Sequence, residues 1–434
     1  MYTEEAKIKR ATYHLWTFMT SKLISSFGSN VYAFAISFYI LQVTASASIF
    51  AINLICSILP RILVGPIAGY VADNFSKKRT IIIAQIVQTL TIGGLLIYTI
   101  SFGLSLYAIY TTTIVLSLAS SFSTVTFSSS ITRLIDEARI QRAMSLNQMS
   151  VSIATIGGPV AGGILYGTVS IPVFLAIYMT ASAIAVILDA TMNFNLFAKP
   201  KDPSKPKVRE SAIQNFKEGL VYLRKQKLIT ALMFVALLVN FLFGAVQVGF
   251  SYVLINLLHM ESQHVGIIEG ALAVGFLIGS IYFSIGKEVK YPLLVSKRGI
   301  IGMGLGMGAI SIPLFITLSY WGNFTINLII MLSIGMLSIV VNTPVGVVMQ
   351  KTIDNDYKGR VFSILETTSM ALMPLGMVIF GFLYDLLPAE WVLIGTTIIL
   401  IVIVLYLLRP SVIYNVYPEL NKRNQQMSKV ETTA

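Results

Sequence analysis

Long apolar runs, separated by short polar segments, follow one another along nearly the whole chain. Each run has roughly 20 residues or more, the length that an α-helix needs to cross a bilayer. The pattern predicts twelve transmembrane helices, at residues 16–42, 47–73, 80–101, 104–128, 143–168, 171–194, 228–258, 263–285, 299–319, 324–348, 361–385 and 389–408. A membrane β-barrel would show short alternating segments instead. The chain is therefore predicted to be an all-α polytopic membrane protein.

The distribution of basic residues predicts the orientation. Of the 31 Lys and Arg residues, all but two fall in the terminal tails or in alternate loops. The loops between these, such as QVTASAS, SFG and SYWGNF, carry no basic residue. By the positive-inside rule both termini are cytoplasmic. The net charge of +12 then reflects topology, and we expect no nucleic-acid partner and no cleaved leader.

A Pro- and Lys-rich segment divides the chain into two halves. We expect an amino-terminal six-helix bundle at residues 1–194, a cytoplasmic linker at 195–227, a carboxyl-terminal six-helix bundle at 228–410 and a cytoplasmic tail at 411–434. Within the linker, Ser211 is placed to cap an amphipathic helix that lies on the inner membrane surface.

The two halves are related as pseudo-repeats. A shift of 218 residues aligns TRLIDEARIQRAMSL at 132–146 with QKTIDNDYKGRVFSI at 350–364, without a gap. In the same register Gly158 meets Gly376. Parallel repeats of this kind are typical of transporters that bind substrate near the midplane of the membrane, between the halves.

The segment GYVADNFSKKR at residues 69–79 is similar to the signature that follows helix 2 in the major facilitator superfamily. It departs from the signature at Asn74, where Arg is usual, and at Ser76, where Gly is usual. The resemblance covers nearly the whole chain and implies the fold of that superfamily. It implies a gating role, a latch that steadies the outward-facing form, for Gly69, Asp73, Lys77, Lys78 and Arg79. A purely topological anchor is the alternative.

The segment GGPVAGG at residues 157–163 resembles the helix 5 motif of proton-coupled exporters in the same superfamily. The motif residues are Gly158, Pro159, Gly162 and Gly163. Small residues allow two helices to approach closely and Pro allows a bend, so this motif can seal the halves on the outer side. Ordinary helix packing is the alternative. The segments LPRILVGPIAG at residues 59–69 and FKEGLVYLRKQK at 216–227 are most similar to the branch of macrolide efflux proteins and the enterobactin exporter, which implies a bacterial plasma membrane.

Few ionisable residues fall inside the predicted spans, where charge is costly and usually retained for function. The candidates for binding protons or substrate are Lys22, Arg61, Glu269 and Glu366. Arg61 lies about 18 Å deeper than Asp73 along the same helix, whereas Asp189 is expected to reach the membrane interface. We expect Glu269 or Glu366 to carry the exchanged proton, while Arg61 holds an anionic group of the substrate or tunes that carboxylate. A fixed ion pair between Arg61 and Glu366 is the alternative.

Together these patterns favour secondary export of a small amphipathic compound, drug-like, macrolide-like or siderophore-like, by proton antiport with alternating access. A facilitator of lysophospholipid or another lipid, or a metabolite importer, is the alternative. An enzyme is not expected, and neither a catalytic residue, a cofactor nor a metal site is predicted, because no phosphate loop or metal-ligand spacing occurs. We expect a monomer that contacts small-molecule substrate, protons and membrane lipid.

Overall fold

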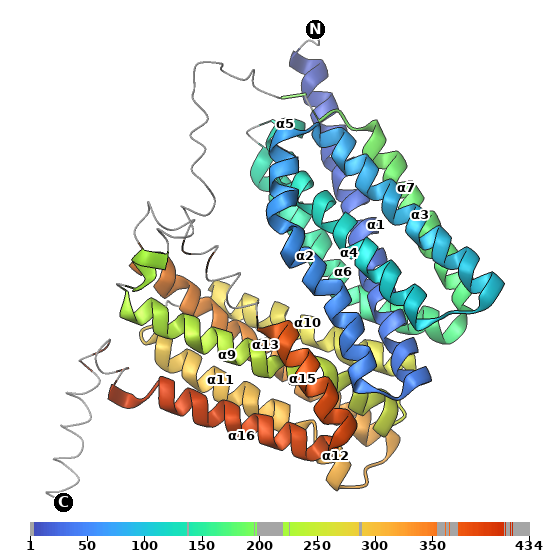
Figure 1. Ribbon diagram of the computed structural model, residues 1–434. Helices are drawn as coiled ribbons and strands as arrows, with labels where there is room; N and C mark the ends of the chain where they lie inside the picture. The colour runs from blue at the N-terminus through green and yellow to red at the C-terminus, as the bar shows by residue number, and fades with distance from the viewer. Residues whose placement is uncertain are drawn as a thin grey trace, which may run out of the picture. The chain divides into compact units, whose positions relative to one another are not determined.

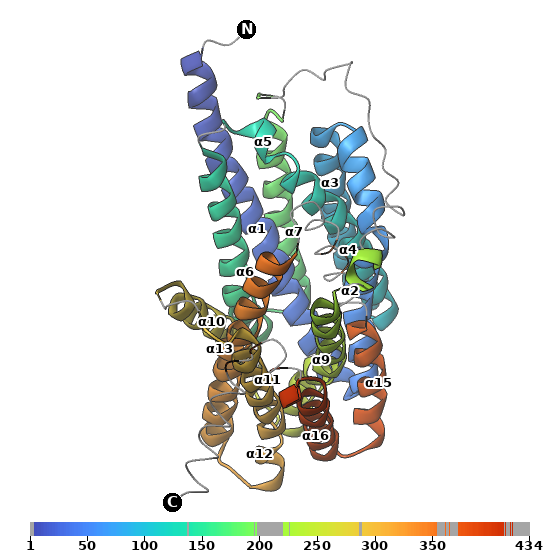
Figure 2. The ribbon, with the colours of Figure 1, turned by 90° about the vertical axis from the view of Figure 1, so that its left-hand side faces the viewer.

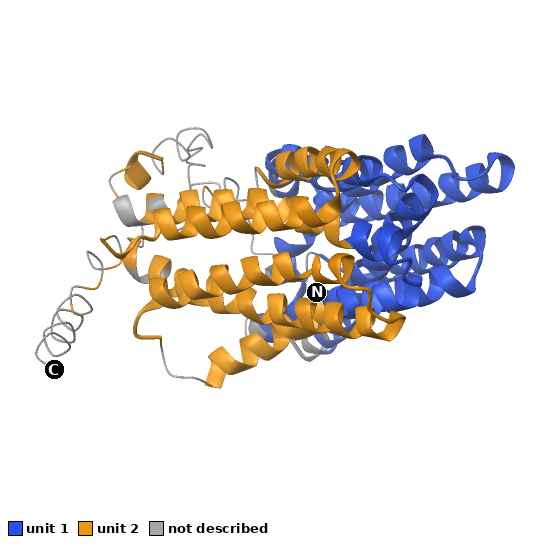
Figure 3. Cartoon of the chain, turned by 90° about the horizontal axis from the view of Figure 1, so that it is seen from below, with its two compact units in different colours: residues 1–208, 251–270 blue, residues 209–250, 271–434 orange. Residues whose placement is uncertain are grey.

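The described residues of this computed structural model form helices and loops, with no strand among them. They are residues 4–136, 139–194, 196–197, 220–224, 226–285, 289–353, 361, 364, 372–411, 413, 417 and 419. Two compact units are present, residues 1–208 with 251–270 and residues 209–250 with 271–434 (Figure 3). Most of the predicted linker and tail lies outside the described residues, so the boundaries 1–194, 195–227, 228–410 and 411–434 stay predictions.

In its described part, the first unit consists mainly of six long helices (Figure 1). These are α1 (Glu4–Thr44), α2 (Ala47–Asn74), α3 (Lys77–Phe102), α4 (Leu106–Ser128), α6 (Ile140–Thr168) and α7 (Ile171–Thr191), with the single turn α5 (Ile131–Leu134) before α6. The π-helix η2 (Val253–Leu257) and the first residues of α10 (Ser262–Ile285) also belong to this unit. Helix α1 packs along α6 and α7, while α4 packs along α2 and α3.

Besides the rest of α10, the second unit holds most of α9 and the helices that follow α10 (Figure 2). These are α9 (Lys227–Tyr252), α11 (Pro292–Ala309), the single turn α12 (Ile312–Phe315), α13 (Tyr320–Thr352), α15 (Met373–Leu386) and α16 (Ala389–Leu407). Helix α11 packs on α13 and α16. Gly275 of α10 lies against the backbone of Leu332 in α13, so these two helices approach closely.

The prediction of an all-α polytopic membrane protein is confirmed. Among the described residues, 11 helices are long and apolar enough to cross a membrane, and Met373–Leu386 is a shorter apolar helix within the predicted span 361–385. Several helices extend beyond their predicted starts, α1 and α11 by the most. Helix α1 already includes Glu4, the first described residue, so it extends well before the predicted start at residue 16. Helix α11 begins at Pro292, since Pro is favourable in a first turn.

Local capping sets the short connections. The side chains of Ser46, Ser105 and Ser319 each accept a hydrogen bond from a backbone N–H three residues later, at the starts of α2, α4 and α13. Gly103 ends α3 with φ 81°, a conformation that glycine adopts without strain. The connections therefore stay short, and the helices that they join run as antiparallel neighbours.

The internal repeat is visible in the buried core of each unit. In the first unit, Ile131, Ile135 and Ala143 belong to one buried apolar cluster. The residues 218 positions later, Met349, Ile353 and Val361, belong to one buried apolar cluster of the second unit. The repeated sequence thus performs the same packing task twice.

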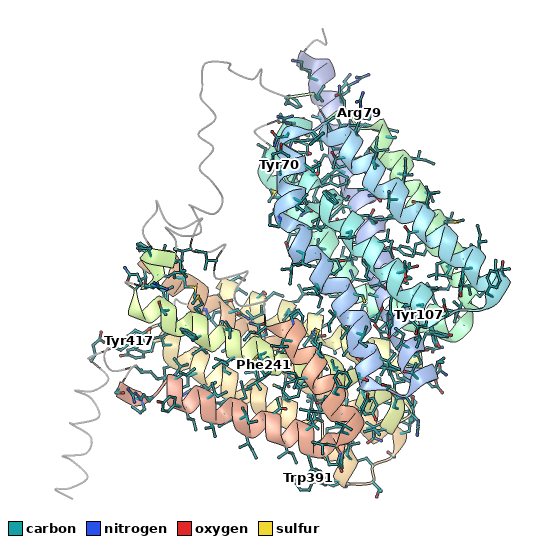
Figure 4. The ribbon with its side chains drawn as sticks, in the orientation of Figure 1. Tyr70, Arg79, Tyr107, Phe241, Trp391 and Tyr417 are labelled. Atoms are coloured by element: carbon teal, nitrogen blue, oxygen red, sulfur yellow. The ribbon has the colours of Figure 1, made fainter. Side chains whose placement is uncertain are left out.

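Equivalent close contacts also join equivalent helices. An added Cβ at Gly158 of α6 would overlap Asn30 of α1, and one at Gly376 of α15 would overlap the backbone of Phe241 in α9. Figure 4 shows Phe241 in the middle of the second unit, between Trp391 and Tyr417 at its ends. The offset is 218 residues between α6 and α15 but 211 between α1 and α9, because the connecting segments differ in length.

We predict that Gly158→Ala lowers the thermal midpoint of the purified protein. The added methyl meets Asn30, including its backbone carbon at 3.3 Å, and overpacking of this kind costs about 1–3 kcal/mol. Gly94→Ala is the matched control, because an added Cβ there meets no atom within 4 Å. Thermal unfolding followed by intrinsic fluorescence in detergent measures both. Equal midpoints for the two variants would contradict the close packing of α1 on α6.

Candidate functional site

A polar stripe follows one face of α1. Its members recur as adjacent pairs four residues apart, a spacing that keeps them on one side of a helix: Ser21 and Lys22, Ser25 and Ser26, Ser29 and Asn30. Together with residues of α2, α3, α4 and α6, five of the six line a cavity of about 170 Å³, here called the polar pocket. Its lining is Lys22, Ser25, Ser26, Ser29, Asn30, Arg61, Gln85, Gln88, Ser120, Ser123, Thr124, Phe127 and Val151, all in the first unit.

Two of the sequence-predicted residues, Lys22 and Arg61, meet in this pocket. Both are cations, and the lining contains no carboxylate. Arg61 also lines a second cavity of about 120 Å³, which includes Asn53 and Thr113. The Thr113 hydroxyl donates to Asn53 Oδ1 over 3.1 Å. The arrangement directs positive charge and hydroxyl groups into a small space inside an otherwise apolar bundle.

Asp189 of α7 lies beside this pocket and is completely buried, with 0% exposure. The Ser21 hydroxyl donates to its Oδ1 over 2.5 Å, and the Gln85 amide donates to its Oδ2 over 3.0 Å. Gln85 Nε2 also donates to Ser25 Oγ over 3.2 Å, and Lys22 interacts electrostatically with the carboxylate. Asp189 is thus enclosed by neighbouring helices, and the expectation that it reaches the membrane interface stays a prediction. Neighbouring helices supply donors to the carboxylate, which makes its burial tolerable.

Sequence analysis did not single out Ser21 and Gln85, although a signal was present. Ser21 belongs to the paired polar stripe of α1, and a periodic polar stripe in an apolar span indicates a face that meets other polar groups. Gln85 and Gln88 lie three residues apart in α3 and so share a face. Asp189 itself could be placed only once α7 was known to pack on α1 and α3.

Glu269 lies two turns into α10. Its carboxylate accepts a hydrogen bond of 3.2 Å from the Ser251 hydroxyl. It lines neither the polar pocket nor the second cavity of Arg61. Glu366 lies outside the described residues, so the proton-carrying role of either carboxylate and the pairing of Arg61 with Glu366 stay predictions.

The predicted gating residues cluster where α2 ends and α3 begins. Lys77 is buried and its ammonium group donates to Ser129 Oγ over 2.6 Å, which ties this loop to the end of α4. Figure 4 shows Arg79 and Tyr70 near one end of the first unit and Tyr107 near the other.

The remaining gating residues give no further support for a latch. Lys78 is half-buried, an added Cβ at Gly69 would meet no atom within 4 Å, and the side chain of Asp73 lies outside the described residues. The gating role of this segment therefore stays a prediction.

The glycine-rich motif of α6 packs on two partners. Gly158 and Gly162 face α1, where an added Cβ at Gly162 would lie 3.0 Å from the Val31 carbonyl oxygen. Gly163 faces the start of α10, and its carbonyl accepts a hydrogen bond of 2.9 Å from the Ser262 hydroxyl. The carbonyl of Pro159 in turn lies against Gly266. Close packing of the motif is thus present, while its role in antiport stays a prediction.

Comparison with known proteins gives consistent results. A family model described as Major Facilitator Superfamily matches residues 18–374. Macrolide efflux protein A of Streptococcus pyogenes is 25% identical over 395 residues, covering 90% of this chain and 94% of that protein. Multidrug efflux pump Tap of Mycobacterium tuberculosis is 21% identical over 370 residues, covering 84% and 85%.

Two solved structures share the fold at low sequence identity. A bacterial homologue of the iron transporter ferroportin matches with a TM-score of 0.68 and 14% identity, covering 91% of this chain and 98% of that chain. A nucleoside transporter matches with a TM-score of 0.66 and 16% identity, covering 91% and 99%. These likenesses support the helical architecture.

We predict that Ser21 and Asp189 are energetically coupled. Ser21→Ala removes a hydrogen bond to a charged group, at a cost of about 1.5–3 kcal/mol. Asp189→Asn removes the charge that this hydroxyl serves, so the double variant should be less destabilised than the sum of the singles. Thermal unfolding of the four proteins in detergent measures the coupling. Strictly additive effects would show that the contact contributes no stability.

Proposed function

The chain belongs to the major facilitator superfamily, and from this premise we propose that it exports a small amphipathic compound across the plasma membrane of a bacterium in exchange for protons. The observation that carries the proposal is the polar pocket, because a buried set of cations and hydroxyl groups in a transmembrane bundle is costly unless it serves a ligand. Two efflux proteins match 90% and 84% of the chain. These matches support export as the direction of transport.

The proposed orientation places both termini in the cytoplasm. The alternation of basic and non-basic loops along the chain supports it. Lys78 and Arg79 would then lie at the inner surface, where they can interact with anionic lipid head groups.

Glu269 is the proposed proton carrier among the described residues. Its hydrogen-bond partner there is the neutral hydroxyl of Ser251, and no described cation pairs with it. A carboxylate in a membrane helix that no cation holds in the charged form can gain and lose a proton during a transport cycle. Glu366 is the second candidate for the same role.

We further propose that the contact between α6 and the start of α10 opens and closes during transport. Gly163 and Gly266 bring the two backbones close, and the Ser262 hydroxyl donates a hydrogen bond across the contact. A contact built from small residues can part without unpacking large side chains. This property suits a seal that forms once in every cycle.

Export is tested in efflux-deficient bacterial cells that produce the protein, with a panel of dyes, macrolides and a labelled siderophore. We expect lower accumulation of at least one compound, and a protonophore should abolish the difference. Glu269→Gln should lose the protonophore-sensitive export, because an amide cannot carry the proton. Glu390→Gln, in the first turn of α16, is the matched control and should retain it.

Full protonophore-sensitive export by Glu269→Gln would reject Glu269 as the proton carrier. Unchanged accumulation of every compound, with the protein present in the membrane, would reject export of these classes and favour a lipid facilitator. Higher accumulation would favour an importer.

A further inference from the structure

The two basic residues that lie inside the predicted spans, Lys22 and Arg61, line the same pocket although they come from different helices. We propose that the polar pocket binds the anionic head group of an amphiphile, so that the transported molecule is an acidic amphiphile with a carboxylate or phosphate at one end. This inference rests on the proposed transport of an amphipathic compound and adds the charge of that compound.

The balance of charge around the pocket supports an anionic ligand. Two cations line the pocket, and Asp189 is the one carboxylate of the described residues that interacts with them, through Lys22. Asp189 is fully buried behind Ser21 and Gln85, and so does not reach the cavity. Arg61 has no carboxylate partner among the described residues. An uncompensated cation inside a membrane protein is costly, and a bound anion would remove that cost.

The uncharged lining supplies hydrogen-bond donors that no other group uses. Gln88, Ser120 and Ser123 face the cavity, and none of them forms a hydrogen bond with another described residue. Arg61 adds a planar fork of donors, whose geometry matches the two oxygens of a carboxylate or phosphate. Lys22 adds a compact positive charge on the opposite helix. The set is suited to an oxyanion rather than to a neutral or cationic group.

The sizes of the two cavities fit a head group and the beginning of an apolar body. The polar pocket encloses about 170 Å³, whereas sites for whole drug-sized ligands enclose about 300–1,000 Å³. The second cavity, of about 120 Å³, shares Ser29, Arg61, Gln88 and Ser120 with the polar pocket, and its lining combines further hydroxyl side chains with the apolar Ile36, Leu54 and Leu116. Arg61 therefore borders two adjoining cavities, and aliphatic side chains line the second of them. A head group in the first space would direct its apolar body into the second.

A matched set of fluorescent amphiphiles tests the proposal with the full chain in phosphatidylcholine nanodiscs. The probes share a dansyl group and an undecyl chain and end in a carboxylate, an alcohol or an amine. We expect the acid to bind about tenfold or more tightly than the alcohol, since it gains charge-assisted hydrogen bonds. The amine should bind more weakly still, because Lys22 and Arg61 repel it.

Variants of the lining residues test whether the preference for the acid over the alcohol arises in the polar pocket. Lys22→Gln and Arg61→Gln should each lower the affinity for the acid about tenfold while leaving that for the alcohol unchanged. Arg61→Lys keeps the charge and should retain most of the acid preference. Arg142→Gln, an exposed cation of α6 outside the pocket, should change nothing. Thermal midpoints identify any variant that fails to fold. If one does, the comparison of acid binding between Arg61→Lys and Arg61→Gln still tests the proposal.

Equal binding of the acid and the amine, or an unchanged preference in Arg61→Gln, would overturn the proposal. Discs with one third phosphatidylglycerol separate the two sources of the head group. If the acid binds more weakly in these discs to the wild type but not to Arg61→Gln, the pocket binds an anionic lipid. If binding of the acid is unchanged, the pocket binds a solute. Because binding is measured without transport, head-group selectivity with failed export would reject the export proposal alone. Export without head-group selectivity would reject the anion site alone.

Discussion

Inside a bilayer, a polar or charged group must find its partner within the protein, because the surrounding hydrocarbon offers none. The environment of Asp189 follows from this constraint. Asp189 accepts hydrogen bonds from Ser21 of α1 and Gln85 of α3, so a single carboxyl group on α7 connects three helices. The same constraint explains why the polar face of α1 turns toward α2, α3 and α4 and away from lipid.

Close approach of backbones is the second condition for the fold. Without water to drive association, membrane helices depend on packing, and small residues bring the backbones near enough for it. Gly158 and Gly162 serve this purpose between α1 and α6, and Gly244 and Gly376 do so between α9 and α15. The contacts of Gly158 and Gly162 hold the polar stripe of α1 in place against α6. The geometry of the polar pocket therefore depends on glycines that do not line it.

Much of the fold could be predicted from the sequence, because the bilayer makes apolar length and basic loops direct indicators of helices and topology. The same reasoning found Lys22 and Arg61, since a charge in an apolar run is conspicuous. It did not reveal the environment of Asp189, because position along one helix does not show which neighbours enclose a side chain. Gln85 was overlooked for the same reason: its role arises only from contacts with Asp189 of α7 and Ser25 of α1.

Helices α1 and α9 correspond at an offset of 211 residues. They make equivalent packing contacts, but the polarity of their equivalent side chains differs. The polar stripe Ser21, Lys22, Ser25, Ser26, Ser29 and Asn30 corresponds to Leu232, Met233, Ala236, Leu237, Asn240 and Phe241. Five of these six polar positions are thus apolar in the second copy. The close glycine contacts are present in both halves, whereas this face of the helix differs between them. Specificity for a ligand could therefore evolve in one half while the other preserved the scaffold.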